Sequence, residues 1–171
     1  MRRTIAVLAF ASLLAACGKP AGHDDQPAAP SEPASAPAST PAVAAPSDAD
    51  KTAALATLPA AYQGADLDNG QARFALCKSC HTAVAGGAAM TGPNLYGVFG
   101  RKAGSSPGFS YSDGLKSSGI VWDADHLDKW IADPRAVVAS TKMTFLGVKD
   151  PKDRRDLIAY LKVATTAPAK S

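Results

Sequence analysis

The chain has 171 residues, a formal net charge of +3 and 19% charged residues. Its lysines and arginines do not form a block, which argues against a nucleic-acid partner, because binding nucleic acid requires a concentrated basic face. The N-terminal third is strongly biased in composition, so the remainder forms one domain of roughly 100 residues. A core of that size buries little area, and a buried cofactor would enlarge it.

Residues 1–16 have the layout of a secretory signal peptide. A positive start is followed by an apolar run from Ile5 to Ala16, which is too short to cross a bilayer comfortably. The segment ends in Leu14-Ala15-Ala16-Cys17, which resembles the lipobox of bacterial lipoproteins and predicts a lipid on Cys17. The alternative is an ordinary cleaved signal that releases a soluble protein. Both interpretations place the domain on the periplasmic side of a bacterial membrane.

Residues 17–65 are predicted to form a disordered tether. Up to about Asp50 they are mostly Ala, Pro and Ser, which disfavour regular helix and offer little apolar surface to bury. A Pro-rich chain of roughly thirty to forty residues extends on the order of 100 Å at about 3 Å per residue. With a lipid on Cys17, this tether would hold the domain at a high effective concentration near one membrane surface. The domain itself is predicted to span residues 66–164, with residues 165–171 as a flexible tail.

Cys77-Lys78-Ser79-Cys80-His81 is the pattern of a c-type haem attachment site. Side chains three residues apart share a face of a helical turn, so both thiols can bind one porphyrin edge while the imidazole binds the iron. A thioredoxin-like redox pair would need a βαβ context, and a zinc site would need a second Cys/His pair. Neither is present, since the remaining cysteine is Cys17.

The domain is predicted to be all-α, because no stretch alternates apolar and polar residues. Asp66 to Ser79 predicts the first helix, in which Gly70 and Phe74 share a face that another helix can cross closely. Further helices are expected after N-caps at three positions. These caps are Ser112, Asp123 and Asp150. The long loops between the helices are expected to wrap around a haem.

The iron needs a second axial ligand, and the candidates are Met90, His126 and Met143. Met90 is only nine residues from His81, in the loop expected to wrap the histidine side. His126 lies on the polar side of its predicted helix. Met143 lies in a loop between two helices, where its thioether can reach the iron, and this favours Met143.

From roughly Asp66 to Ala164 the sequence resembles the class I cytochromes c of the mitochondrial type. Several blocks occur in order and at the spacing of that family. In addition to the Cys-Lys-Ser-Cys-His pattern they are Thr91-Gly92-Pro93-Asn94-Leu95, Gly97-Val98-Phe99-Gly100-Arg101-Lys102, Gly108-Phe109-Ser110-Tyr111, Gly119-Ile120-Val121-Trp122, Thr141-Lys142-Met143-Thr144-Phe145 and Asp156-Leu157-Ile158-Ala159-Tyr160-Leu161.

The resemblance implies one covalently held haem c, bound through Cys77 and Cys80, with His81 and Met143 as axial ligands. It also implies that the Pro93 carbonyl accepts a hydrogen bond from the other imidazole nitrogen of His81. The implied fold is the small cytochrome c fold, with its first and last helices crossed.

Five more residues receive roles from the resemblance. Arg101, Tyr111 and Trp122 would hold the haem propionates. Thr141 would place a hydroxyl beside the ligands, and Phe145 would line the exposed haem edge. From the residues alone, the alternative is that the two aromatics are core residues and that Arg101 is a surface charge.

The sequence departs from the mitochondrial pattern at three places. Trp130 stands where those proteins usually carry a tyrosine that reaches the methionine sulfur, and an indole can donate but not accept. Ala139-Ser140 replaces the usual Pro-Gly before the methionine loop, which predicts a less rigid loop. The segment between Phe74 and Cys77 is one residue shorter.

The resemblance implies a one-electron carrier rather than an enzyme, since both axial positions are filled. The expected protein is a periplasmic, membrane-tethered monomer that links a quinol-oxidising complex of cytochrome bc1 type to a terminal oxidase or reductase. The alternatives are a haem c peroxidase or gas or redox sensor with a displaceable sixth ligand, and a purely structural lipoprotein. From Asp66 onward there are 14 Lys and Arg against 10 Asp and Glu, so electrostatic steering is expected to be modest.

Overall fold

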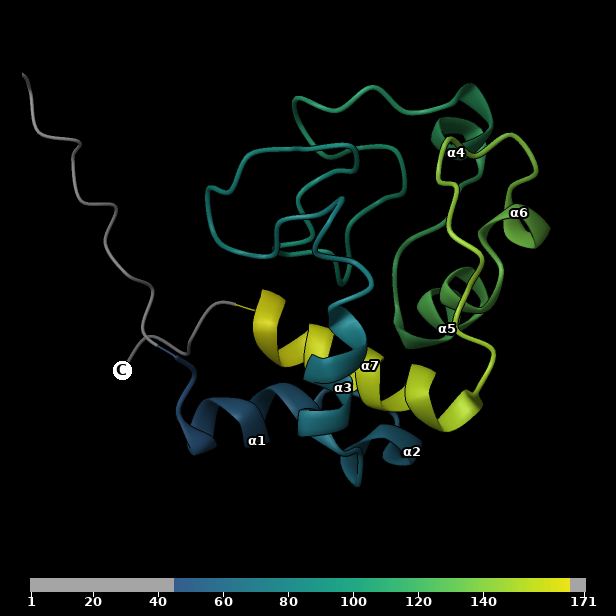
Figure 1. The fold of residues 1–171 in the computed structure, drawn as a ribbon. Coiled ribbons are helices and arrows are strands. Elements are labelled where there is room, and N and C mark those ends of the chain that lie inside the picture. The colour runs from purple at the N-terminus through teal and green to yellow at the C-terminus, as the bar shows by residue number, and fades with distance from the viewer. Residues whose placement is uncertain (1–44, 167–171) are drawn as a thin grey trace, which may run out of the picture. The chain divides into compact units, whose positions relative to one another are not determined.

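The computed structural model describes residues 45–166. The predicted signal peptide, the lipid site at Cys17, most of the tether and the end of the tail lie outside these residues. The described part contains the helices α1 (Asp48–Ala56), α2 (Ala60–Gln63), α3 (Leu67–Phe74), α4 (Asp113–Ser117), α5 (Ala124–Ala132), α6 (Pro134–Val137) and α7 (Pro151–Thr165), shown in Figure 1. It contains no strand, only one backbone bridge between Lys102 and Val121. The all-α prediction is confirmed.

Helices α3 and α7 cross where Gly70 faces the backbone of α7 (Figure 1). A Cβ added to Gly70 would overlap the carbonyl oxygen of Asp156 and lie 2.7 Å from Cβ of Tyr160. One turn further along α3, the rings of Phe74 and Tyr160 pack with their centroids 5.6 Å apart. The crossing predicted from the glycine and phenylalanine on one face of α3 is therefore confirmed.

The crossing contains one fully buried carboxylate, that of Asp156, which is 0% exposed. It accepts hydrogen bonds from Lys152 Nζ at 2.7 Å, from an Arg155 guanidinium nitrogen at 2.8 Å and from Asn69 Nδ2 at 2.9 Å. The backbone N–H of Asp66, at the start of α3, donates a fourth at 3.1 Å. Burial alone raises the pKa of this carboxyl, but the donors outweigh it and hold the pKa of Asp156 well below its usual value.

The predicted N-caps are present at all three positions. The Ser112 hydroxyl accepts from the backbone N–H of Leu115, and the Asp123 carboxylate accepts from that of His126. The Asp150 carboxylate accepts from the backbone N–H groups of the second and third residues of α7. Each bond satisfies a helix-terminal donor that has no partner within its own helix. The helices of this domain therefore begin where short-range patterns indicate.

The first predicted helix ends earlier than expected, at Phe74 instead of Ser79. Residues 75–80 form consecutive tight turns, with the N–H of Cys77 bonded to the Phe74 carbonyl at 2.9 Å and that of Cys80 to the Cys77 carbonyl at 3.1 Å. The serine and cysteines here have weak helix propensity, and the Cys80 carbonyl accepts from the N–H of Gly92 instead of from the next helical turn.

The folded part of the chain begins before residue 66, so the predicted tether is too long at its C-terminal end. Helix α1 begins with a capping box between Ser47 and Asp50, and Ala54, Leu58 and Tyr62 are buried. Figure 1 shows α1 and α2 beside α7. These three apolar anchors hold a segment whose Ala-rich composition resembles the tether.

Helix α7 also extends one residue beyond the predicted domain end at residue 164. Thr165 is 1% exposed, and its carbonyl oxygen accepts from the N–H of Gly97 at 2.8 Å. Each helix between residues 45 and 166 is too short or too polar to cross a bilayer.

We expect Gly70→Ala to destabilise the domain by about 3 kcal/mol or more, because the added methyl group meets rigid backbone on α7. Thermal unfolding of the haem-loaded protein should shift down by at least about 10 °C. Gly64→Ala is the matched control, since a Cβ there meets no atom within 4 Å. Equal melting temperatures for the two variants would contradict the close crossing.

We expect Asp156→Asn to cost about 2 kcal/mol at neutral pH, because an amide keeps only one accepting oxygen, loses the negative charge and places an NH2 donor among the donors that surround the carboxylate. A lowered pKa in the folded state stabilises the protein fully above the unfolded pKa of about 4, and this stabilisation is lost as the pH falls through the folded pKa. The gap in melting temperature between wild type and variant should therefore be constant from pH 8 to about 5 and narrow below about pH 4. A gap that persists to pH 2 would contradict this, and the exposed Asp68→Asn serves as the control.

Candidate functional site

Cys77 and Cys80 lie in the tight turns that follow α3, and both are free, half-buried thiols. Burial, with a smaller contribution from neighbouring Cys80, raises the pKa of the Cys77 thiol to about 11. The thiol is therefore protonated at neutral pH. The N–H of His81 bonds to the Cys77 carbonyl at 2.9 Å, which joins the imidazole-bearing residue directly to the first cysteine.

The imidazole of His81 is oriented by the backbone of the loop that follows it. Its Nδ1 lies 2.7 Å from the carbonyl oxygen of Pro93, the contact that the resemblance implied. Because a carbonyl can only accept, Nδ1 carries the proton and the lone pair of Nε2 is left for a metal. Burial lowers the pKa of His81, against a smaller opposing effect of the Pro93 bond, so the ring is neutral at pH 7 as metal ligation requires.

Gly92 leaves the space that the His81 ring occupies, a role that the sequence did not indicate. A Cβ at Gly92 would lie 2.7 Å from both Nδ1 and Nε2 of His81, so any side chain there would displace the imidazole. The N–H of Gly92 also bonds to the Cys80 carbonyl at 2.8 Å. Its position directly before Pro93 was the available signal, because a glycine in a loop often marks a close approach of the backbone.

Asn94 holds the loop after His81 together, and its role was also missed. Its Nδ2 donates to the carbonyls of Val84 at 2.9 Å and Gly87 at 2.7 Å, and its Oδ1 accepts from the N–H of Tyr96 at 2.7 Å. The last bond is an Asx turn, a local feature that Asn in a glycine-rich loop predicts. One side chain thus replaces the secondary structure that this loop lacks.

Arg101 lies against the same loop. Its guanidinium donates to the backbone carbonyls of Asn94 at 2.9 Å and Tyr96 at 3.1 Å. Arginine has five N–H donors, so these two bonds leave others for an anion. The predicted propionate role of Arg101 stays a prediction, while its contact with the loop backbone is a structural role that the sequence did not indicate.

Two indoles pack edge to face beneath the loops. Trp122 and Trp130 are 7% and 8% exposed, with ring centroids 5.2 Å apart. Neither indole N–H has a hydrogen-bond acceptor among residues 45–166. Every fully buried polar side-chain atom in this part of the chain does have a partner. The two indole N–H groups are therefore not fully buried, and each opens onto accessible space. Tyr111 packs edge to face on Phe109, and its hydroxyl likewise has no acceptor in this part of the chain. These donors fit carboxylates such as those of a haem.

The loop that carries Met143 is tied down in spite of the missing Pro-Gly. The buried hydroxyl of Thr141 accepts from the backbone N–H of Met143 at 3.2 Å, and the N–H of Thr141 bonds to the Val138 carbonyl at 3.0 Å. Lys142 Nζ donates to the Ser110 carbonyl at 2.9 Å. Met143 and Phe145 are half-buried against the core. Thr141 therefore positions the methionine through the backbone.

The other candidate ligands are placed differently. His126 Nδ1 lies 2.8 Å from Oδ1 of Asp123, the cap of its own helix, and Met90 is 50% exposed. Neither is packed against the hydrophobic core as Met143 is. The arrangement of these side chains supports Met143 as the second ligand, which stays a prediction.

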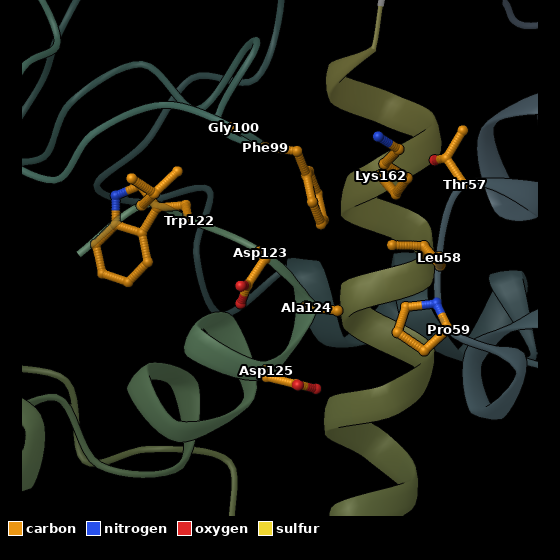
Figure 2. Close-up of a pocket in the computed structure, with 11 residues that line it drawn as sticks. Thr57, Leu58, Pro59, Phe99, Gly100, Trp122, Asp123, Ala124, Asp125 and Lys162 are labelled. Carbon is orange, nitrogen blue, oxygen red and sulfur yellow. The ribbon is translucent and has the colours of Figure 1, made fainter.

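A cavity of about 420 Å³ lies elsewhere, beside α7 (Figure 2). Its walls include Leu58 and Pro59 from the segment between α1 and α2, and Asp123 before α5. Lys162 Nζ stands over the Phe99 ring at 4.9 Å, and burial lowers the pKa of this lysine. The cavity is lined by neither cysteine and neither predicted iron ligand, but Trp122, a predicted propionate partner, forms part of its wall.

Two thiols, a neutral imidazole with a free nitrogen, a thioether on a tied loop and unpaired indole donors fit a covalently attached haem. The site and the small all-α fold together define a haem-binding protein of c type.

Comparison with known proteins gives the family. The sequence profile of the family Cytochrome c matches residues 67–165. The chain is 47% identical over 109 residues to cytochrome c2 of Rhodomicrobium vannielii, which covers 64% of this chain and 87% of that protein. It is 50% identical over 90 residues to cytochrome c of Theileria parva, covering 53% and 77%. Cytochrome cH from Methylobacterium extorquens superposes with a TM-score of 0.52 at 48% identity, covering 57% of this chain and 97% of that one.

The chain therefore belongs to the cytochrome c family. It is an electron carrier with one covalently bound haem c, and not an enzyme.

We expect Gly92→Ala to impair histidine ligation, because the added methyl group occupies the place of the His81 ring. Most of the purified variant should lack the low-spin haem spectrum of the wild type, as measured by visible absorption. The neighbouring Thr91→Ala, at an exposed position, should keep it. A normal low-spin spectrum of Gly92→Ala would show that the ring does not depend on this glycine.

Proposed function

We propose that this protein carries single electrons in the periplasm while a lipid on Cys17 tethers it to a membrane. His81 Nε2 and the Met143 sulfur are the axial ligands of its haem in this proposal. The observation that carries the ligand assignment is the 2.7 Å contact between His81 Nδ1 and the Pro93 carbonyl, which leaves Nε2 as the metal-binding atom.

Haem c supplies the one-electron couple, and the residues of the chain set how it works. The Pro93 carbonyl and Gly92 keep the His81 ring in one orientation and one tautomer. Thr141 keeps the Met143 backbone in place. A thioether ligand favours the ferrous state and, with burial, raises the reduction potential. A ligand set held this way changes little between oxidation states, which suits fast electron transfer.

The N-terminal residues support the proposed location. The lipobox-like end of the apolar run supports export and attachment through Cys17, and the Ala/Pro/Ser-rich segment after it supports a long reach. A periplasmic carrier with this reach would accept electrons from a quinol-oxidising complex of cytochrome bc1 type. It would deliver them to a terminal oxidase or reductase.

We expect Met143→Ala to open the iron to carbon monoxide and to lower the reduction potential by on the order of 0.1 V, a fraction of the roughly 0.8 V that axial ligands span. Potentiometric titration and carbon monoxide difference spectra measure both effects. Met90→Ala is the matched control, because Met90 is 50% exposed and should leave both unchanged. If Met143→Ala kept the ligand-field spectrum of the parent, the axial assignment would be wrong.

We expect the membrane-extracted protein to begin at Cys17, with its mass raised by acyl chains and one haem. Intact mass spectrometry reports signal cleavage, lipidation and haem together. Cys17→Ser should yield a product without acyl chains that no longer sediments with membranes. A wild-type protein that is soluble and carries no acyl group would contradict the tether.

A further inference from the structure

Helix α4 touches the loop that carries Met143. Figure 1 shows α4 beside the chain that follows α6, and the contact is made by Gly114 on the helix and Ser140 on the loop. A Cβ added to Gly114 would overlap the hydroxyl oxygen of Ser140 and would lie 3.3 Å from Cγ1 of Val138. The serine side chain therefore occupies the space that a side chain on Gly114 would fill.

The backbone of α4 does not itself require a glycine at position 114. Gly114 is the second residue of α4, and it is not one of the glycines with positive φ among residues 45–166. Alanine is normally the better residue within a helix, because glycine loses more conformational entropy on folding. The close approach of Ser140 is therefore what explains a glycine here.

Ser140 lies three residues before Met143, and hydrogen bonds connect the backbone between them. The N–H of Thr141 bonds to the Val138 carbonyl at 3.0 Å, and the N–H of Met143 donates to the Thr141 hydroxyl at 3.2 Å. Val138 and Thr141 are both buried, each 8% exposed. A movement of Ser140 away from α4 would therefore move the backbone that carries Met143.

The loop is also anchored on both sides of Met143. Before it, Lys142 Nζ donates to the carbonyl oxygen of Ser110 at 2.9 Å, in the segment that leads into α4. After it, the N–H of Val148 bonds to the Ile131 carbonyl of α5 at 2.9 Å. A loop anchored on both sides cannot shift as a whole to make room for a larger residue on α4.

We propose that Gly114 and Ser140 are a matched pair of positioning residues that keeps Met143 on the iron. The missing side chain of Gly114 makes room for the Ser140 hydroxyl, and this fit holds the methionine loop against α4. The inference rests on the proposed ligation of the iron by Met143. It explains how the loop is fixed where Ala139-Ser140 replaces the Pro-Gly of the mitochondrial pattern.

The test measures how often Met143 leaves the iron in the full-length, haem-loaded protein. Carbon monoxide binds ferrous haem only while the sixth position is open, so its binding rate reports the open fraction. We expect Gly114→Ala to raise this rate by about tenfold and to weaken the methionine-to-iron charge-transfer band, because the added methyl group overpacks the contact. If residue 114 served only the helix, alanine would cause no such increase.

Ser140→Gly changes the contact from the other side. Alone it should raise the carbon monoxide binding rate by about threefold or more, because the loop loses the contact and gains backbone freedom. Combined with Gly114→Ala it should give a rate below that of either single variant, because the methyl group then fills the space that the hydroxyl left. If Gly114→Ala alone does not yield haem-loaded protein, Ser140→Gly and the double variant still decide the question.

Ala139→Gly is the matched control for this rescue. Ala139 is exposed and directly precedes Ser140, so its replacement loosens the same loop but leaves the serine hydroxyl in place. Combined with Gly114→Ala, it should not lower the carbon monoxide binding rate of Gly114→Ala. A rescue as complete as that by Ser140→Gly would mean that backbone freedom alone matters, and it would overturn the matched pair.

The failure of this inference can be told from the failure of the ligand assignment. If Met143→Ala binds carbon monoxide rapidly while Gly114→Ala binds it as slowly as wild type, the matched pair is overturned and ligation by Met143 stands. The same holds if the double variant is no slower than the single variants. If wild type and Met143→Ala bind carbon monoxide at the same rate, the axial assignment is wrong and this inference falls with it.

Discussion

The close approach of α3 and α7 at Gly70 is the constraint on which the rest of the domain depends. Because Gly70 has no side chain, the two backbones touch, and the Asp156 carboxylate of α7 can accept from the backbone N–H of Asp66, which caps α3. The last residue of α3, Phe74, packs on Tyr160 and is followed directly by the turns that carry both cysteines. Fixing α3 on α7 therefore fixes where Cys77, Cys80 and His81 lie.

A few polar side chains hold the loops around the site together by bonding to their backbone groups. Asn94 and Arg101 each bond two carbonyls of the loop that follows His81, and Pro93 orients the imidazole itself. Thr141 does the same for the methionine loop. Long loops without secondary structure are otherwise unfavourable in a small domain. Here they hold a ligand set rigidly, which is what a one-electron carrier needs.

The two short N-terminal helices and the haem loops lie on opposite sides of the domain. Figure 1 shows α1 and α2 on one side of the α3 and α7 pair and the loops of residues 81–111 on the other. The ion pairs Arg73–Asp153 and Arg154–Asp128 join α7 to α3 and to α5.

The sequence by itself determined the features that depend on near neighbours. The caps at Ser112, Asp123 and Asp150, the attachment pattern at residues 77–81 and the glycine and phenylalanine face of α3 each act over a few residues, so a short pattern is sufficient to predict them. The ordered blocks of the cytochrome c family extended this to the fold and the cofactor.

Only the tertiary structure decided what depends on distant partners. Helix α1 has nine residues, too few to be stable alone, and it forms because Ala54 is buried in the folded domain. The turns after α3 do not continue as a helix beyond Cys80, because the Cys80 carbonyl accepts from the N–H of Gly92, twelve residues further on. In each case the deciding hydrogen bond or buried contact joins segments that meet only after the chain has folded.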